Sequence, residues 1–156
     1  MNRLLKTIGL VLMLSLSTTA FAAERINTLE KGFFGYKASG IAIGGYDTVA
    51  YFTRGEAVQG LDEYQSEWQG ATWKFASRDH QQQFEADPER YAPQFGGYCA
   101  YGVATGELWR GSAEHWAIVD DRLYLNYDAE WMGKWEAGRA QMIAEADLRF
   151  DALLVD

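Results

Sequence analysis

Two stretches of alternating hydrophobic and polar positions predict two β-hairpins. The first stretch covers residues 63–76, where Gln69-Gly70 can turn the chain between two β-prone runs. The second joins residues 116–119 to residues 123–125 through Asp120-Asp121, a pair that suits a tight turn. Successive side chains of a strand point to opposite faces, so this period-two pattern indicates half-buried antiparallel strands.

Helical signals follow each predicted hairpin. Ser77 is a good N-cap for a helix, and Asp87 before Pro88 marks the start of a second, short helix. From residue 129 to 154 the large apolar residues recur in step with a helix, and Gly138 divides this segment in two. Short central helices and a C-terminal helical segment are therefore expected.

The remaining segments predict less regular structure. Residues 23–40 are expected to form an extended lead-in whose aromatic side chains dock on the body, and residues 48–52 are β-prone. Residues 96–102 are expected to form a glycine-rich loop. No internal repeat is evident. Strands beside helices, without βαβ alternation, predict one small α+β domain over residues 41–156.

The first 22 residues predict a signal peptide. Arg3 and Lys6 precede a short apolar run over residues 8–16, and Ala20-Phe21-Ala22 provides the small-x-small pattern of a cleavage site. The apolar run is too short for a retained membrane span, which needs about 20 apolar residues. We therefore expect export to the periplasm or secretion, with no membrane attachment after cleavage.

Charge and cysteine content narrow the classes of partner. The chain carries 22 acidic and 14 basic side chains, which gives a formal net charge of −8. An acidic surface repels phosphate backbones and anionic lipid heads, so nucleic acid and membranes are not expected partners. The single cysteine, Cys99, excludes an intramolecular disulfide.

Five short runs resemble the exported YHS-domain proteins. The Asp-Pro-Glu run at residues 87–89 and the Gly-Gly-Tyr-Cys run at residues 96–99 are the most specific of them. Together the runs span most of the chain from about residue 40 to residue 135, and they occupy residues 45–52, 68–75, 84–93, 96–101 and 123–127. The resemblance implies a YHS-like fold and a binding protein of the periplasm.

The resemblance also implies metal binding, because relatives in the wider YHS group carry a Phe-Cys-Ser-x-x-Cys segment associated with it. Here Ala76 and His80 stand at the two thiol positions. One cysteine and two histidines exclude a closed Cys/His tetrad, but Cys99, His80 and His115 could form a three-donor copper or zinc site. The alternative is that His80 is a surface residue at a helix start and His115 faces solvent.

Cys99 is the candidate for chemistry. Its glycine neighbours leave room for a partner to approach, and a thiolate is both a metal ligand and a nucleophile. We expect a metal-binding module using Cys99 and His80, and we assign no catalytic residue. Two alternatives stay open: a thiol redox protein using Cys99 with an external thiol, and a non-catalytic module that binds another protein through exposed aromatic rings. A buried Cys99 would favour the last.

Overall fold

The computed structural model describes residues 24–155, so the predicted signal peptide lies outside the described residues. Over that range the chain forms α-helices, short 3-10 helices and two-stranded antiparallel sheets. The fold is α+β, as predicted. Within residues 24–155 no helix is long and apolar enough to cross a membrane.

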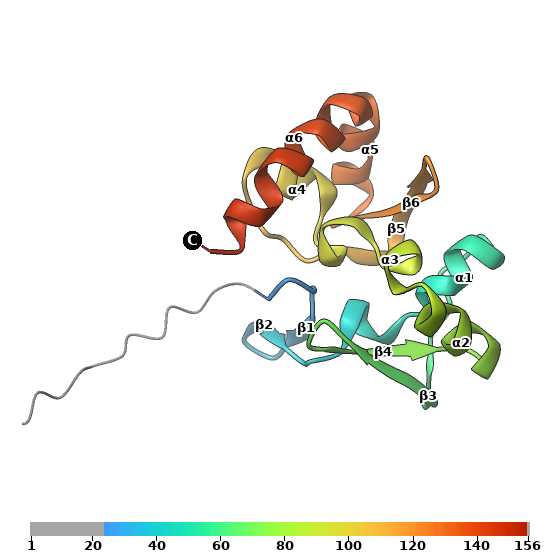
Figure 1. The fold of residues 1–156 in the computed structure, drawn as a ribbon. Coiled ribbons are helices and arrows are strands. Elements are labelled where there is room, and N and C mark those ends of the chain that lie inside the picture. Colours follow the sequence, from blue (N-terminus) through green and yellow to red (C-terminus); the bar gives the residue numbers. More distant parts are fainter. Residues whose placement is uncertain (1–23, 156) are drawn as a thin grey trace, which may run out of the picture.

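Two copies of one structural unit follow each other along the chain, and Figure 1 shows the first in cyan to yellow-green and the second in yellow to orange. Each copy consists of a 3-10 turn, a short helix, a β-hairpin and a second helix. The first copy, residues 42–86, contains η1 (Ala42–Gly45), α1 (Thr48–Thr53), β3 (Leu61–Trp68), β4 (Ala71–Phe75) and α2 (Arg78–Ala86). The second copy, residues 94–137, contains η2 (Gln94–Gly97), α4 (Ala100–Thr105), β5 (Ser112–Val119), β6 (Arg122–Asn126) and α5 (Ala129–Ala137).

Equivalent backbone hydrogen bonds establish the correspondence between the copies. The amide N–H of Asp47 donates to the carbonyl of Val58 at 2.8 Å, and the N–H of Cys99 donates to that of Trp109 at 2.8 Å. Each bond ties the residue before the first helix of its copy to the segment that enters the hairpin. Asp47 therefore corresponds to Cys99, and the expectation that the chain has no internal repeat is wrong.

The 3-10 turns of the two copies share the same unusual backbone. Ile43 and Gly44 have φ angles of 52° and 62°, and Phe95 and Gly96 have φ angles of 55° and 59°. A left-handed conformation at a bulky residue such as isoleucine or phenylalanine is costly. Both residues are buried, so packing of their side chains offsets this cost.

Residues 23–40 were expected to be an extended lead-in, but they form a hairpin of β1 (Leu29–Gly32) and β2 (Gly35–Ala38). Its tip does not dock on the body, because Phe33 and Phe34 are 94% and 98% exposed. The expectation of docked aromatic side chains at the tip is therefore wrong.

Two further segments are more helical than predicted. Residues 48–52 form α1 rather than a strand, because the buried Asp47 carboxylate accepts the N–H groups of Val49 and Ala50 and so caps a helix. The expected loop at 96–102 instead contains the end of η2 and the start of α4. Gly96 and Gly97 permit the left-handed turn in the second segment, but the chain then continues as helix α4 (Ala100–Thr105).

The hairpins and the other helix starts match the predictions. β3 pairs with β4, and β5 pairs with β6. Ser77 caps α2, and Asp87 caps α3 (Pro88–Tyr91), which follows α2 in the link to the second copy. Gly138 separates α5 from α6 (Arg139–Leu153).

Two hydrophobic clusters form the core, and each belongs mainly to one copy. The first cluster centres on Trp73, Phe75 and Phe84, and the second on Trp135 and Tyr124. Helix α6 completes the second cluster by packing against α4. The copies are thus two small cores in contact, with no continuous sheet between them.

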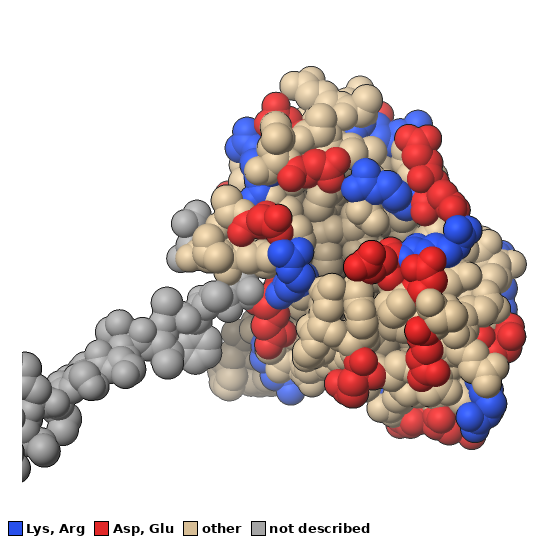
Figure 2. Space-filling model, in the orientation of Figure 1, with Lys and Arg blue, Asp and Glu red and all other residues tan. Residues whose placement is uncertain are grey.

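The segment before β1 ties the copies together through Asn27. Its backbone N–H donates to the carbonyl of Gly96, while its carbonyl accepts from the N–H of Ile43. Its side-chain amide donates to the carbonyl of Gly97 at 3.0 Å. One buried residue therefore bonds to the 3-10 turns of both copies. On the face drawn in Figure 2, acidic and basic side chains are interspersed rather than gathered into one patch.

Candidate functional site

The buried carboxylate of Asp47 organises the first copy. Oδ1 accepts the backbone N–H groups of Val49 and Ala50 at 2.9 and 3.3 Å, and Oδ2 accepts that of Ala76 at 2.8 Å. Oδ2 also lies 2.6 Å from Nδ1 of His80. The carboxylate thus joins the start of α1, the end of β4 and the imidazole on α2.

His80 is 6% exposed, so the prediction of a surface histidine is wrong. Its position on α2 turns the imidazole inward, on the same face as the core residue Phe84. One ring nitrogen faces Asp47, and the other lies 3.3 Å from Oγ1 of Thr53. Both nitrogens are thus engaged within the first copy.

Cys99 is 0% exposed, so the expected opening beside the glycines is absent from this part of the structure. Its Sγ donates toward Oδ1 of Asn126 at 3.7 Å. Burial raises the pKa of the thiol, and the nearby backbone amides, such as that of Gly102, offset this only in part. A raised pKa lowers the thiolate population, so the prediction of an accessible, activated thiol is wrong.

The three predicted metal donors have separate surroundings. Cys99 faces Asn126 and His80 faces Asp47, while Nδ1 of His115 is buried without a hydrogen-bond partner among residues 24–155. Over the same residues, no group of three or more His, Cys, Asp or Glu side chains is placed to hold a metal ion. The copper or zinc site at Cys99 and His80 therefore stays a prediction without support from this geometry.

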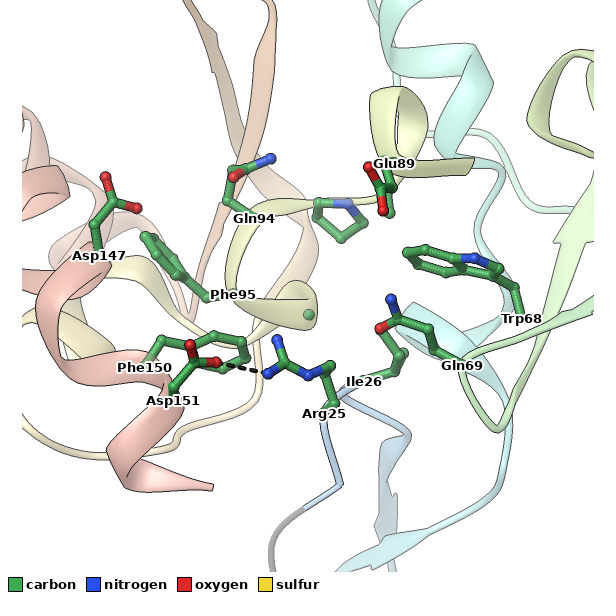
Figure 3. Close-up of a pocket in the computed structure, with 13 residues that line it drawn as sticks. Arg25, Ile26, Trp68, Gln69, Glu89, Gln94, Phe95, Asp147, Phe150 and Asp151 are labelled. Carbon is green, nitrogen blue, oxygen red and sulfur yellow. Dashed lines mark hydrogen bonds and ion pairs between the residues drawn. The ribbon is translucent and has the colours of Figure 1, made fainter. Parts of the chain in front are cut away.

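A polar pocket of about 280 Å³ lies where the two copies and the segment before β1 meet. In Figure 3, Trp68 and Glu89 line one side, Phe150 and Asp151 line the other, and Arg25 reaches between them to Asp151. The Arg25–Asp151 ion pair is 2.6 Å long and exposed, and such pairs are screened by water. The pocket's basic side chain, Arg25, is thus already paired with Asp151, and Asp147 is paired with Arg122.

A second, apolar pocket of about 400 Å³ lies between the β1–β2 hairpin and the second copy. We call it the aromatic pocket, and its lining residues are Leu29, Tyr36, Leu108, Trp109, Arg110, Tyr127 and Trp131. The rings of Trp109 and Trp131 meet edge to face, with centroids 5.0 Å apart. Rigid aromatic walls with few polar groups are typical of ligand sites.

The polar groups of the aromatic pocket gather at one end. The hydroxyls of Tyr36 and Tyr127 lie 3.1 Å apart. The guanidinium carbon of Arg110 lies 5.3 Å from the Tyr36 ring centroid and 6.0 Å from that of Tyr127. The Tyr127 hydroxyl, followed by the guanidinium of Arg110, lowers the pKa of Tyr36.

One wall residue of the aromatic pocket, Trp131, corresponds to His80 of the first copy. Trp131 lies three residues after the α5 cap Asp128, as His80 lies three residues after the α2 cap Ser77. Sequence analysis missed the pocket, since the large apolar residues of 129–154 indicated only a helix. The shared Gly-Gly-Tyr at residues 44–46 and 96–98 was the signal that could have aligned the copies.

Comparisons with protein-family models, with curated proteins and with solved structures found no match for this chain. The resemblance to exported YHS-domain proteins therefore stays a prediction.

Proposed function

We propose that this chain is an exported, non-catalytic binding module of the YHS-like kind, and that its aromatic pocket takes an apolar or aromatic group of a partner. The observation that carries the proposal is the pocket itself: about 400 Å³ enclosed largely by tryptophan, tyrosine and leucine side chains. Filling such a site removes apolar surface of both the pocket and the bound group from water, and this burial is the dominant driving force of association.

The surroundings of the other candidate residues favour binding over chemistry. A reactive cysteine needs an electropositive, accessible setting, whereas Cys99 is sealed among backbone and Asn126. His80 is held by Asp47 inside the first copy. Neither side chain faces the aromatic pocket.

The β1–β2 hairpin favours a protein as the partner. Phe33 and Phe34 at its tip stand almost fully in solvent, with ring centroids 4.8 Å apart. The same hairpin supplies Leu29 and Tyr36 to the pocket. A partner seated in the pocket can thus also cover exposed phenylalanine rings, and aromatic residues are enriched at protein interfaces.

The test uses the mature chain, residues 23–156, and the neutral probe 4-phenylbutan-1-ol as a mimic of an apolar group. The six indole N–H resonances are followed by NMR during the titration. We expect saturable shifts at Trp109 and Trp131, and we expect the variant Trp131→Ala to abolish them. The matched control is Trp68→Ala, which removes a half-buried tryptophan outside the pocket.

Shifts spread evenly over all six indoles, or saturable binding that survives Trp131→Ala, would place binding elsewhere and overturn the proposal. The indole spectra of both variants report directly whether the fold is intact. If Trp131→Ala loses the dispersed spectrum of a folded protein, it is replaced by Trp131→Phe. This variant keeps a smaller aromatic ring in the pocket wall.

A further inference from the structure

Arg110 gives the aromatic pocket a cationic end. Its guanidinium lies between the rings of Tyr36 and Tyr127, and its buried Nε has no hydrogen-bond partner among residues 24–155. Within the same residues, Arg110 forms no ion pair with a carboxylate. Arg110 lines the pocket, and the remaining N–H donors of its guanidinium can bind an incoming anion.

Two other charged groups near the pocket are engaged in contacts of their own. Lys134 stacks on Trp131, with Nζ 3.8 Å from the ring centroid, and it is paired with Glu130. The Asp128 carboxylate accepts the N–H of Trp131 and so caps α5. The chain has a net charge of −8, so most of its surface repels anions. A pocket lined by an arginine that has no salt bridge within the described residues is an exception and can attract an anion.

Resting on the function proposed above, we infer that the ligand group is a carboxylate joined directly to an apolar or aromatic body. The body fills the space against Trp109 and Trp131, and the carboxylate meets Arg110 and the two tyrosine hydroxyls. The planar fork of arginine matches a carboxylate through two parallel hydrogen bonds. A small carboxylic acid and the C-terminus of a polypeptide that ends in an aromatic residue share this chemistry.

The experiment compares matched probes that differ only in the head group. The small-molecule arm uses 4-phenylbutanoate and 4-phenylbutan-1-ol, and the peptide arm uses acetyl-Gly-Gly-Phe with either a free carboxylate or a C-terminal amide. Affinities are measured at pH 7 by the indole shifts of Trp109 and Trp131. We expect each carboxylate to bind about 10- to 100-fold more tightly than its neutral partner, as for a hydrogen bond to a charged group.

The variant Arg110→Gln is expected to remove the preference for the carboxylate probe over its neutral partner. The matched control is Arg122→Gln, since Arg122 also lies over a tyrosine ring, Tyr124, but outside the pocket. The control variant should keep the full preference. A larger preference for the carboxylate in the small-molecule probes indicates a small carboxylic acid as the ligand. A larger preference in the peptide probes indicates a polypeptide C-terminus.

Equal binding of acid and neutral partner by the native chain would overturn the carboxylate inference and leave the proposed function standing. A preference that survives Arg110→Gln would also overturn it, because the charge responsible would lie elsewhere. Absence of binding by all four probes would contradict both the inference and the proposed function.

Discussion

The two copies hold different side chains in the same backbone frame. In the first copy Asp47 precedes the short helix, accepts three backbone N–H groups and is paired with His80. In the second copy Cys99 takes the equivalent place and faces Asn126. One backbone frame thus surrounds a carboxylate hydrogen-bonded to an imidazole, and the other surrounds a buried thiol.

The partner positions differ as well, and this difference creates the pocket. Where the first copy places His80 against Asp47, the second places Trp131, which lines the aromatic pocket with Trp109. In the first copy His80 makes internal hydrogen bonds, whereas in the second Trp131 lines a pocket.

The largest expected effect comes from removing the carboxylate of the first copy. Asp47→Ala leaves the N–H groups of Val49, Ala50 and Ala76 and the His80 ring without their buried acceptor, which we expect to cost about 3–5 kcal/mol of unfolding free energy. Urea denaturation measures this loss. The control Asp62→Ala removes an exposed ion-paired carboxylate and should cost less than about 1 kcal/mol. Equal losses would contradict the assigned role.

Moving the carboxylate to the second copy tests whether the frame alone can hold it. Cys99→Asp places a buried charge opposite the side-chain amide oxygen, Oδ1, of Asn126, with no imidazole to pair with it. We expect a loss of about 2–3 kcal/mol of unfolding free energy at pH 7. Burial raises the folded pKa of such a carboxyl, so the loss should shrink as pH falls toward 4. Adding Trp131→His should recover about 1 kcal/mol. If the free energy of unfolding of Cys99→Asp does not change across this pH range, the backbone amides alone are enough to stabilise the buried carboxylate.

The glycines of the two 3-10 turns should differ in their tolerance of a side chain. Gly44 and Gly96 have nearly the same left-handed φ, but a Cβ at Gly44 meets open space while one at Gly96 would lie 1.8 Å from the carbonyl oxygen of Arg25. We expect Gly44→Ala to cost about 1 kcal/mol, the price of the backbone conformation. Gly96→Ala should cost about 2 kcal/mol more, because the segment before β1 must move. If thermal denaturation shows equal losses of stability for the two variants, the segment before β1 can move aside at no cost in free energy.

The predicted hairpins and caps were correct because their determinants are local. Gln69-Gly70 and Asp120-Asp121 provide turn residues next to alternating strands, and Ser77 lies directly before its helix. Residues 48–52 were predicted wrongly for a different reason. Their β-branched and aromatic side chains favour a strand, but the buried Asp47 cap and tertiary packing override that propensity.

The candidate site was less predictable because it depends on contacts distant in sequence. Tyr36 and Tyr127 meet across 91 positions, and Asp47 and His80 meet across 33. Composition indicated that Cys99 was chemically special, yet whether a thiol is sealed or open depends on how α4 packs. The glycines that suggested access in fact serve the left-handed turn of η2.

The smallest expected effect comes from Cys99→Ala, which separates the binding proposal from the predicted copper or zinc site. Cys99 behaves as a small buried hydrophobe in this fold, so we expect a loss of about 1 kcal/mol of unfolding free energy. The native thiol has a raised pKa, so its ionisation opposes the folded state. Native stability should therefore fall as pH rises through the ordinary thiol pKa of about 8.5, and the variant should lack this part of the fall.

Cys99→Ala also tests the predicted copper or zinc site. Copper(I) and zinc(II) affinities, measured by competition with a chelator, should be equal in the native chain and in Cys99→Ala, because the native sulfur faces Asn126 rather than an imidazole. His80→Gln serves as the second arm, since it removes the other predicted donor. A drop in affinity in both variants would require the two copies to rearrange so that Sγ and the imidazole meet. That result would restore the metal site and displace the aromatic pocket as the basis of function.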